Sequence, residues 1–235
     1  MLNLGGVVPG NLLPWVLFAP VFPLLLLLLR RIHFNATNTA LVLLCVVSVI
    51  SNTFLLLAKG NPVQTSFIHV TFIAEFLFTA LLLKTCTPNP VLKYSIITTI
   101  LVFLGIFTSF SIMGSGEKSG IEIVMKTGVV ILFIASLLVL ASKVNKVDEH
   151  LIMSQDFWFT AGIFFHFGLY SLLLLTSKST TDLNYHDEDP FSIMYVIIFC
   201  LQFIFFSVGI LLPKSLDIRQ EKNNKRNDTL QKPRW

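Results

Sequence analysis

The sequence predicts an all-α membrane protein, built as a polytopic bundle of seven transmembrane helices. Hydrophobic residues make up 54% of the 235 residues and charged residues only 13%, about half the charged share of a soluble domain. The mean hydropathy is +0.77. Apolar stretches of about 20 residues, the length that crosses the hydrocarbon core of a bilayer, recur along the whole chain. We therefore expect this chain to lie in a lipid bilayer.

The connections between the apolar stretches are short, so we expect no separate soluble domain of ordinary size. Residues 1–213 form one transmembrane domain in this interpretation. Residues 214–235 form a polar, basic tail whose lack of hydrophobic periodicity favours disorder, with contact to anionic lipid headgroups as an open alternative. The expected helices are residues 12–29, 39–57, 65–83, 94–113, 121–141, 157–175 and 191–212.

The first expected helix contains Pro14, Pro20 and Pro23. Each proline removes a backbone donor, and neighbouring helices must compensate for the loss. No basic residue precedes this helix, whereas Arg30 and Arg31 follow it. Because a cleaved signal peptide carries its basic residues before the apolar run, we expect a retained anchor with its N-terminus outside.

The distribution of Lys and Arg predicts the orientation of the bundle. Thirteen of these residues fall in the connections 30–38, 84–93 and 143–156 and in the segment after Leu212, against three on the opposite side. Basic residues mark the cytoplasmic side, so we expect the N-terminus outside and the C-terminus in the cytoplasm. The expected location is the inner (plasma) membrane.

Spacing within the second and fourth expected helices predicts which residues share a face. Cys45, Ser48 and Asn52 follow one another at intervals of three and four residues and lie on one side of the second helix. In the fourth helix, Gly105 and Ser109 are four residues apart, which predicts a face for close helix packing.

Glu75 lies at the centre of the third expected helix. A charged side chain at the middle of a membrane costs about 2.5–3.5 kcal/mol on insertion scales. On a helical wheel, Thr71 and Thr79 fall about 40° to either side of Glu75, and His69 falls about 120° away. The third helix therefore has a polar stripe, and a functional reason for Glu75 is expected.

Polar residues in other helices reach a similar depth. Glu75, His166 and Gln202 each lie roughly nine to eleven residues from a helix end, about 13–16 Å from an interface and so near the midplane. His166 and Tyr170 share one face of the sixth helix, and Gln202 shares a face of the seventh with Tyr195. We expect a polar pocket that opens outward, with Glu75 and His166 at its floor. Candidates in the outer half are Asn52, His69, Lys126, Tyr170 and Tyr195.

Two interpretations of these residues stay open. In the functional one, Glu75 and His166 form a pair that shares a proton or binds a ligand, because ionisable groups inside a membrane mark functional sites by default. In the structural one, desolvation keeps Glu75 protonated, and it hydrogen-bonds across helices to His166 or Gln202. Lys126 can equally pair with Glu122, one turn away, and extend its amine outward.

Several other chemistries are not supported by the sequence. A retinal protein needs a lysine in the membrane, usually in the last helix, and the seventh expected helix has none. The motifs GxSxG, HExxH, GxGxxG and the P-loop are missing. The acidic connection 176–191 lacks the pattern of a calcium loop, and the three cysteines are interpreted as packing residues rather than a disulfide framework. We expect no cofactor, metal or nucleic-acid partner.

Three segments are informative in their order and spacing: EFLF at Glu75–Phe78, QDFWFTAGIFFHFGLYSLLLLTSK at Gln155–Lys178, and the closing Gly209–Leu212. Through them, from Leu12 to Leu212, the chain resembles a large group of uncharacterised seven-helix proteins from Bacteroidota. Similar bundles form the N-terminal membrane region of some sensor histidine kinases there. The resemblance implies an inner-membrane protein with a sensory or signalling role, and it carries over no ligand or catalytic residue.

The leading hypothesis is a sensor or receptor-like module. It takes a small ligand or a proton into the outward pocket and signals through a partner protein, because no kinase domain follows Leu212 in this sequence. One alternative is a small-solute or proton-coupled transporter in which Glu75 loads and releases a proton. Another is a membrane enzyme acting on lipid, with Glu75 and His166 as acid and base. Enzymatic activity is the less favoured reading.

Overall fold

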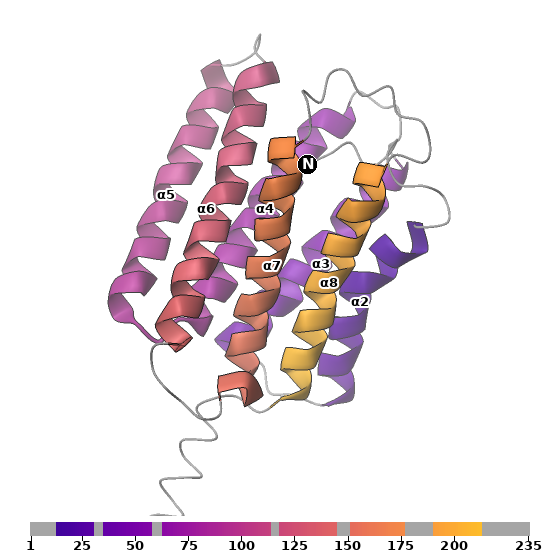
Figure 1. Cartoon of the computed structure of the whole chain (residues 1–235). Coiled ribbons are helices and arrows are strands. Elements are labelled where there is room, and N and C mark those ends of the chain that lie inside the picture. The colour runs from indigo at the N-terminus through magenta and orange to yellow at the C-terminus, as the bar shows by residue number, and fades with distance from the viewer. Residues whose placement is uncertain are drawn as a thin grey trace, which may run out of the picture.

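The computed structural model describes residues 13–30, 35–57, 63–113, 118–144, 151–176 and 190–212. Within these ranges the chain is helical and contains no strand (Figure 1). The helices are α2 (Leu13–Leu29), α3 (Ala36–Leu57), α4 (Val63–Cys86), α5 (Pro90–Met113), α6 (Lys118–Val144), the short 3₁₀ helix η1 (Leu151–Met153), α7 (Gln155–Thr176) and α8 (Pro190–Leu211).

Six of these helices, α3 to α8, are long and apolar enough to cross a membrane. The seventh, α2, is also apolar but has only 17 residues. At 1.5 Å per residue it covers about 25 Å, less than the ~30 Å hydrocarbon core. The described residues thus form an apolar helical bundle suited to a bilayer, and a seventh span stays a prediction.

Polar caps explain why two helices begin earlier than expected from hydrophobicity. The side chain of Asn35 accepts a hydrogen bond from the backbone N–H of Asn38 (2.9 Å), so α3 starts at Ala36 rather than at residue 39. Asn89 likewise accepts from the backbone N–H of Val91 (3.0 Å) and starts α5 at Pro90 rather than at residue 94. A search for apolar runs passes over such polar first turns.

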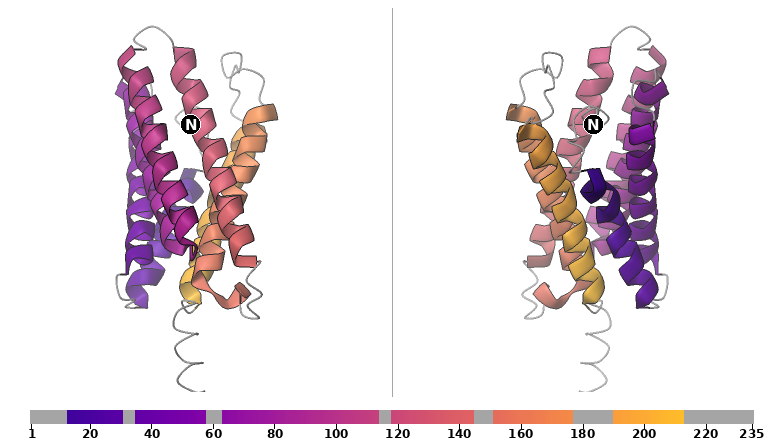
Figure 2. Two further views of the ribbon diagram at one scale, coloured as in Figure 1. Left: turned by 90° about the vertical axis from the view of Figure 1, so that its left-hand side faces the viewer. Right: turned by 90° about the vertical axis from the view of Figure 1, so that its right-hand side faces the viewer.

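Helix α4 occupies the centre of the bundle and packs against α3, α5, α6 and α7. Helix α2 packs between α3 and α8, while α7 packs between α6 and α8. Seen from the side, α3 to α5 and α6 to α8 form two groups that approach each other at the lower end and diverge towards the upper end, with α2 between them (Figure 2). The central helix is the one that carries Glu75.

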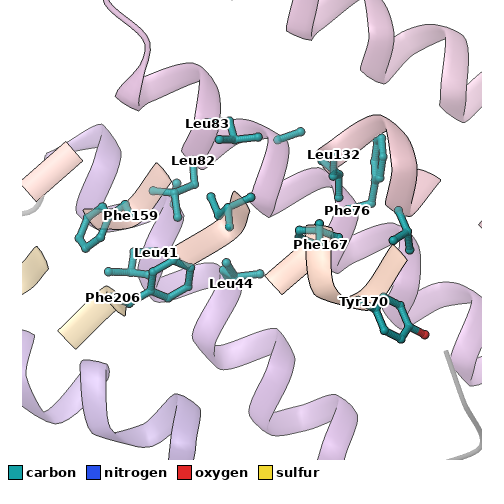
Figure 3. Close-up of a cluster of buried hydrophobic side chains, with 14 of the residues drawn as sticks. Leu41, Leu44, Phe76, Leu82, Leu83, Leu132, Phe159, Phe167, Tyr170 and Phe206 are labelled. Carbon is teal, nitrogen blue, oxygen red and sulfur yellow. The ribbon is translucent and has the colours of Figure 1, made fainter. Parts of the chain in front are cut away.

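The interior on the α5 and α6 side of α4 is aromatic and dry. The rings of Phe76 and Phe103 stack with centroids 4.1 Å apart, and Phe103 also contacts Phe107. Gly128 of α6 faces this cluster, where an added Cβ would lie 2.8 Å from the Phe103 ring. Figure 3 shows Phe76 and Leu132 in the same apolar core. Aromatic rings and a glycine build most of this contact.

Two glycines allow close contact between α7 and α8. A Cβ on Gly162 would lie 2.9 Å from the Cβ of Phe205 and 3.2 Å from the Gln202 carbonyl oxygen. A Cβ on Gly209 would lie 2.7 Å from the Phe159 ring. Small residues let membrane helices approach closely, because no hydrophobic force between helices substitutes for van der Waals contact in lipid.

The close-packing face expected at Gly105 and Ser109 is wrong. Both residues are exposed, a Cβ on Gly105 would meet no atom within 4 Å, and Ser109 bonds to the Gly105 carbonyl of its own helix (2.8 Å). Helix α5 lies at the edge of the bundle and turns Ile100 and Phe103 inward instead. Bulky side chains, not small ones, make the contact of this peripheral helix.

A side chain from α3 satisfies a backbone carbonyl that Pro20 leaves without its helical donor. Pro20 has no N–H, so the carbonyl of Val16, four residues earlier, has no intrahelical partner. The amide nitrogen of Asn52 donates to this oxygen (3.2 Å), and Asn52 is buried. The compensation expected for the prolines of the first helix is therefore supplied by α3 at this position.

Two polar contacts tie the lower end of the bundle together. Arg30, just after α2, donates a hydrogen bond to the carbonyl of Ile210 in the last turn of α8, where carbonyls lack helical partners. The buried side chains of Gln155 and Asn38 join α7 to α3 (2.9 Å). These contacts fix the end at which the helices lie closest.

Some sequence-based expectations lie outside the described residues. They are the expected pairing of Lys126 with the Glu122 side chain, the acidic connection, most connections used in the charge count, and the tail 214–235. All three cysteines are described, and none of them forms a disulfide bond.

Replacing Gly162 by Ala should lower the free energy of unfolding by about 1–3 kcal/mol, because the new methyl overlaps Phe205 and backbone atoms that cannot move aside. Unfolding of the purified protein in mixed micelles measures the change. Gly105→Ala is the matched control and should stay within about 0.5 kcal/mol of wild type. Equal effects of the two substitutions would show that α7 and α8 do not pack as described.

Asn52→Leu should destabilise the wild-type chain by about 0.6–1.7 kcal/mol, the range for hydrogen bonds between membrane helices. In a Pro20→Ala background the same change should have a smaller effect, because the N–H of the new alanine reaches the Val16 carbonyl. A double-mutant cycle on unfolding free energies measures this coupling. Strictly additive effects would mean that Asn52 does not compensate for Pro20.

Candidate functional site

The carboxyl group of Glu75 faces α3 in the middle of the bundle. It is within hydrogen-bonding reach of the hydroxyl groups of Ser48 and Ser51, both of which are buried. The Ser51 contact is the less well formed, since its Oγ makes no hydrogen bond of good geometry among the described residues. Glu75 itself keeps part of its surface accessible, although its partners are interior residues. The carboxyl group therefore lies between α3 and α4.

The polar stripe of the third expected helix faces the interior as its spacing predicts. Thr71 and Thr79, one turn before and one turn after Glu75, are both buried. The Thr71 hydroxyl donates to the Ile68 carbonyl of its own helix (3.1 Å). Local bonds of this kind use the carbonyl groups of the same helix, whereas the contacts of Glu75 with Ser48 and Ser51 reach α3.

Four rings from α7 and α8 form a closed set beside this carboxyl group. Ring centroids lie 6.1 Å apart for His166 and Tyr170, 5.6 Å for Tyr170 and Tyr195, 6.2 Å for Tyr195 and Phe199, and 6.3 Å for Phe199 and His166. Tyr195 also interacts electrostatically with Glu75. The Tyr170 hydroxyl points away from the neighbouring leucine and phenylalanine side chains (Figure 3). Tyr195 thus connects the ring set to Glu75.

His166 is buried, and its two ring nitrogens differ. The ring donates a hydrogen bond to the carbonyl of Ile198 on α8, while Nδ1 has no hydrogen-bond partner among the described residues. The donor is therefore Nε2, and Nδ1 keeps a lone pair that can accept. A buried acceptor without a partner is uncommon in folded proteins and favours a site for a hydrogen-bond donor.

Glu75 and His166 have different hydrogen-bond partners, and their pairing stays a hypothesis. Each group has other partners: Glu75 contacts Ser48 and Ser51 of α3, and His166 contacts Ile198 of α8. The structural interpretation, a bond from Glu75 to His166 or Gln202, stays a prediction as well. Helices α4 and α7, which carry Glu75 and His166, pack against each other, and Tyr195 of α8 interacts electrostatically with Glu75.

Two further candidates do not join this site. Asn52 uses its amide to bind the Val16 carbonyl on α2, a structural role. His69 lies against Phe107 of α5, with ring centroids 6.3 Å apart. Its position about 120° from Glu75 on the helical wheel turns it towards a different neighbour.

Gln202 and Lys126 complete the expected set. Gln202 is buried in the contact between α7 and α8, where its backbone carbonyl oxygen packs close to Gly162. Lys126 is half-buried on α6. The hydrogen-bond partners of Glu75 are instead Ser48 and Ser51.

Ser51 is not among the site residues that the sequence predicts, and Ser48 is predicted only to share a helix face with Cys45 and Asn52. Their spacing of three residues puts both hydroxyls on one face of α3, which is the available signal. Phe199, which closes the ring set, could not be distinguished among 22 phenylalanines. What results is one carboxyl group that contacts two serine hydroxyls, and on α7 a histidine whose Nδ1 can accept a hydrogen bond. Such a set suits a proton or a small cationic or hydrogen-bond-donating solute.

Clusters of three or more His, Cys, Asp or Glu side chains that could hold a metal ion do not occur in the described part of the chain. Comparison of the chain with known protein families, curated proteins and solved structures finds no match. A function for this protein therefore has to be inferred from the physical features of the bundle.

Proposed function

We propose that this protein is a sensor or receptor-like membrane module that binds a small solute or a proton at Glu75. The observation that carries the proposal is the partly accessible Glu75 carboxyl, held among interior hydroxyl groups on the central helix of an apolar bundle. Its neighbours are Ser48 and Ser51 on one side and Tyr195 on the other.

Magnitudes favour a functional role over a purely structural one. Insertion of an acidic residue at the centre of a membrane helix costs about 2.5–3.5 kcal/mol. A hydrogen bond between membrane helices contributes about 0.6–2 kcal/mol. The contact with Ser48 therefore does not offset the insertion cost, and a leucine at this position would be the more stable choice. An acidic residue whose insertion costs more free energy than its contacts return is better explained by a binding site than by a role in helix packing.

The position of Glu75 suits signal transmission. A change of charge or occupancy there acts on α3 through the serines and on α8 through Tyr195. These helices carry the polar contacts of the lower end, Asn38 with Gln155 and Ile210 with Arg30. A shift of either helix would repack that end, where a partner protein could detect it. This is a two-state hypothesis in which the ligand stabilises one packing.

Orientation and location form part of the proposal. Four basic residues lie in or next to the helix turns that meet at the lower end: Arg30, Lys84, Lys93 and Lys143. Basic residues favour the cytoplasmic side, so the signalling end would face the cytoplasm of an inner membrane. The resemblance to sensory bundles of Bacteroidota agrees with this assignment.

A transporter is the second candidate, and a specific observation favours it. Buried hydroxyl residues continue from Glu75 towards the lower end, at Thr79, Ser136 and Thr160, while the helices diverge towards the upper end (Figure 2). A carrier needs polar groups on both sides of its central site. The enzyme alternative is less well supported, because Glu75 and His166 have separate partners and general acid–base catalysis needs both within reach of one substrate.

Glu75→Gln should abolish the response of the reconstituted protein to pH or ligand while leaving insertion intact, since the amide keeps the shape but cannot change charge. Hydrogen–deuterium exchange of α3 and α8 at two pH values measures the response. His166→Phe, which keeps a ring in the set but removes both nitrogens, should weaken it. Thr98→Ala is the control, because this exposed hydroxyl bonds only to its own helix.

Wild-type behaviour of both variants would reject Glu75 as the site. Flux assays in proteoliposomes separate the two candidates. A change in hydrogen–deuterium exchange without solute flux supports the sensor. Solute flux that depends on Glu75 would assign the protein to the transporters.

A further inference from the structure

We propose that Glu75, Ser48 and Ser51 form a binding site for a sodium ion. The inference rests on the proposed function and names the class of its ligand, a small monovalent metal cation. It is carried by the convergence of three oxygen-bearing side chains from α3 and α4 in the membrane interior.

The donor atoms have the chemistry that a hard cation requires. A carboxylate and two hydroxyl groups supply oxygen ligands only, the type preferred by hard cations over the nitrogen and sulfur ligands of transition metals. Ser48 and Ser51 lie one turn apart on α3 and both reach the Glu75 carboxyl. Each hydroxyl can rotate, so it can present a lone pair to a cation instead of its proton to the carboxylate.

The local charge favours a monovalent ion. The hydroxyls of Ser48 and Ser51 on α3 are neutral and reach the Glu75 carboxyl, and Tyr195 of α8 interacts with it electrostatically. His166 of α7 is engaged with Ile198, and His69 on α4 itself faces α5. One carboxylate with Na⁺ is neutral, whereas a divalent ion would leave a net charge in a medium where charge is expensive.

The burial and hydrogen bonding of Ser51 are a second observation that points to a bound ion. The Ser51 side chain is 99% buried, since only 1% of its surface is exposed. Its Oγ nevertheless makes no hydrogen bond of good geometry, although it is directed at the Glu75 carboxyl. A buried polar atom in this state indicates an unfilled position for an ion or water. Water would supply the remaining ligands of the ion.

Thermal unfolding of the full chain in detergent tests the site at about pH 8, where NaCl replaces choline chloride at constant ionic strength. Choline is too large for the site, so it controls for screening. Above the dissociation constant, each tenfold increase in Na⁺ should raise the unfolding midpoint by roughly 3–5 °C. Glu75→Gln and Ser51→Ala should each weaken the apparent Na⁺ affinity at least tenfold. Each variant is judged by the increase in its own unfolding midpoint between choline chloride and NaCl, so a change in its basal stability does not affect the comparison.

Ser109→Ala is the matched control, because that hydroxyl is exposed and bonds to its own helix, and it should keep the full sodium increment. Equal midpoints in NaCl and choline chloride, or a sodium increment that survives Glu75→Gln, would overturn the sodium site. If the exchange response to pH still depends on Glu75 in that case, the proposed sensor stands without sodium. If that response also survives Glu75→Gln, both proposals fail.

Discussion

A single acidic side chain in the membrane interior constrains the rest of this bundle. Glu75 cannot face lipid without a large penalty, so the helix that bears it must be surrounded by other helices. Helix α4 is accordingly the central one and packs against four neighbours. The hydroxyls of Ser48 and Ser51 and the phenol of Tyr195 provide the polar surroundings. The centre of the fold and the candidate site are therefore the same place.

The two sides of α4 differ in a way that suits a site on a rigid support. Towards α5 and α6, stacked phenylalanine rings and Gly128 fill the space with apolar atoms. Towards α3, α7 and α8, hydroxyls and the ring set that contains His166 replace them. Apolar packing is close and hard to deform, whereas hydroxyls can exchange partners at little cost. A binding event at Glu75 would thus act mainly on the polar side.

Backbone groups add a second constraint, because a bilayer offers no water to satisfy them. Pro20 frees the carbonyl of Val16, and Asn52 of α3 donates to it. The last turn of α8 has free carbonyls, and Arg30 donates to one of them. These contacts join the short helix α2 to its neighbours on both sides. A residue that looked like a ligand candidate in sequence, Asn52, is used for this purpose instead.

The sequence by itself determined the class of fold and the existence of the polar centre. Runs of about 20 apolar residues can satisfy their backbone in lipid only as helices, and the depth of Glu75 and His166 follows from counting residues along them. The same counting predicts which residues share a face, and the structure confirms that the stripe of Thr71, Glu75 and Thr79 turns inward.

Only the tertiary structure decided which faces meet. Periodicity gives an angle around one helix axis but no information about the neighbour at that angle. For this reason the sequence left Glu75 with several possible partners, His166 and Gln202 among them, whereas the structure places Glu75 against the serines of α3 and bonds His166 to the Ile198 carbonyl. The sequence also predicted a close-packing face at Gly105, whereas this residue lies exposed at the edge of the bundle. Contacts between helices depend on the packing of the whole bundle, which local spacing does not encode.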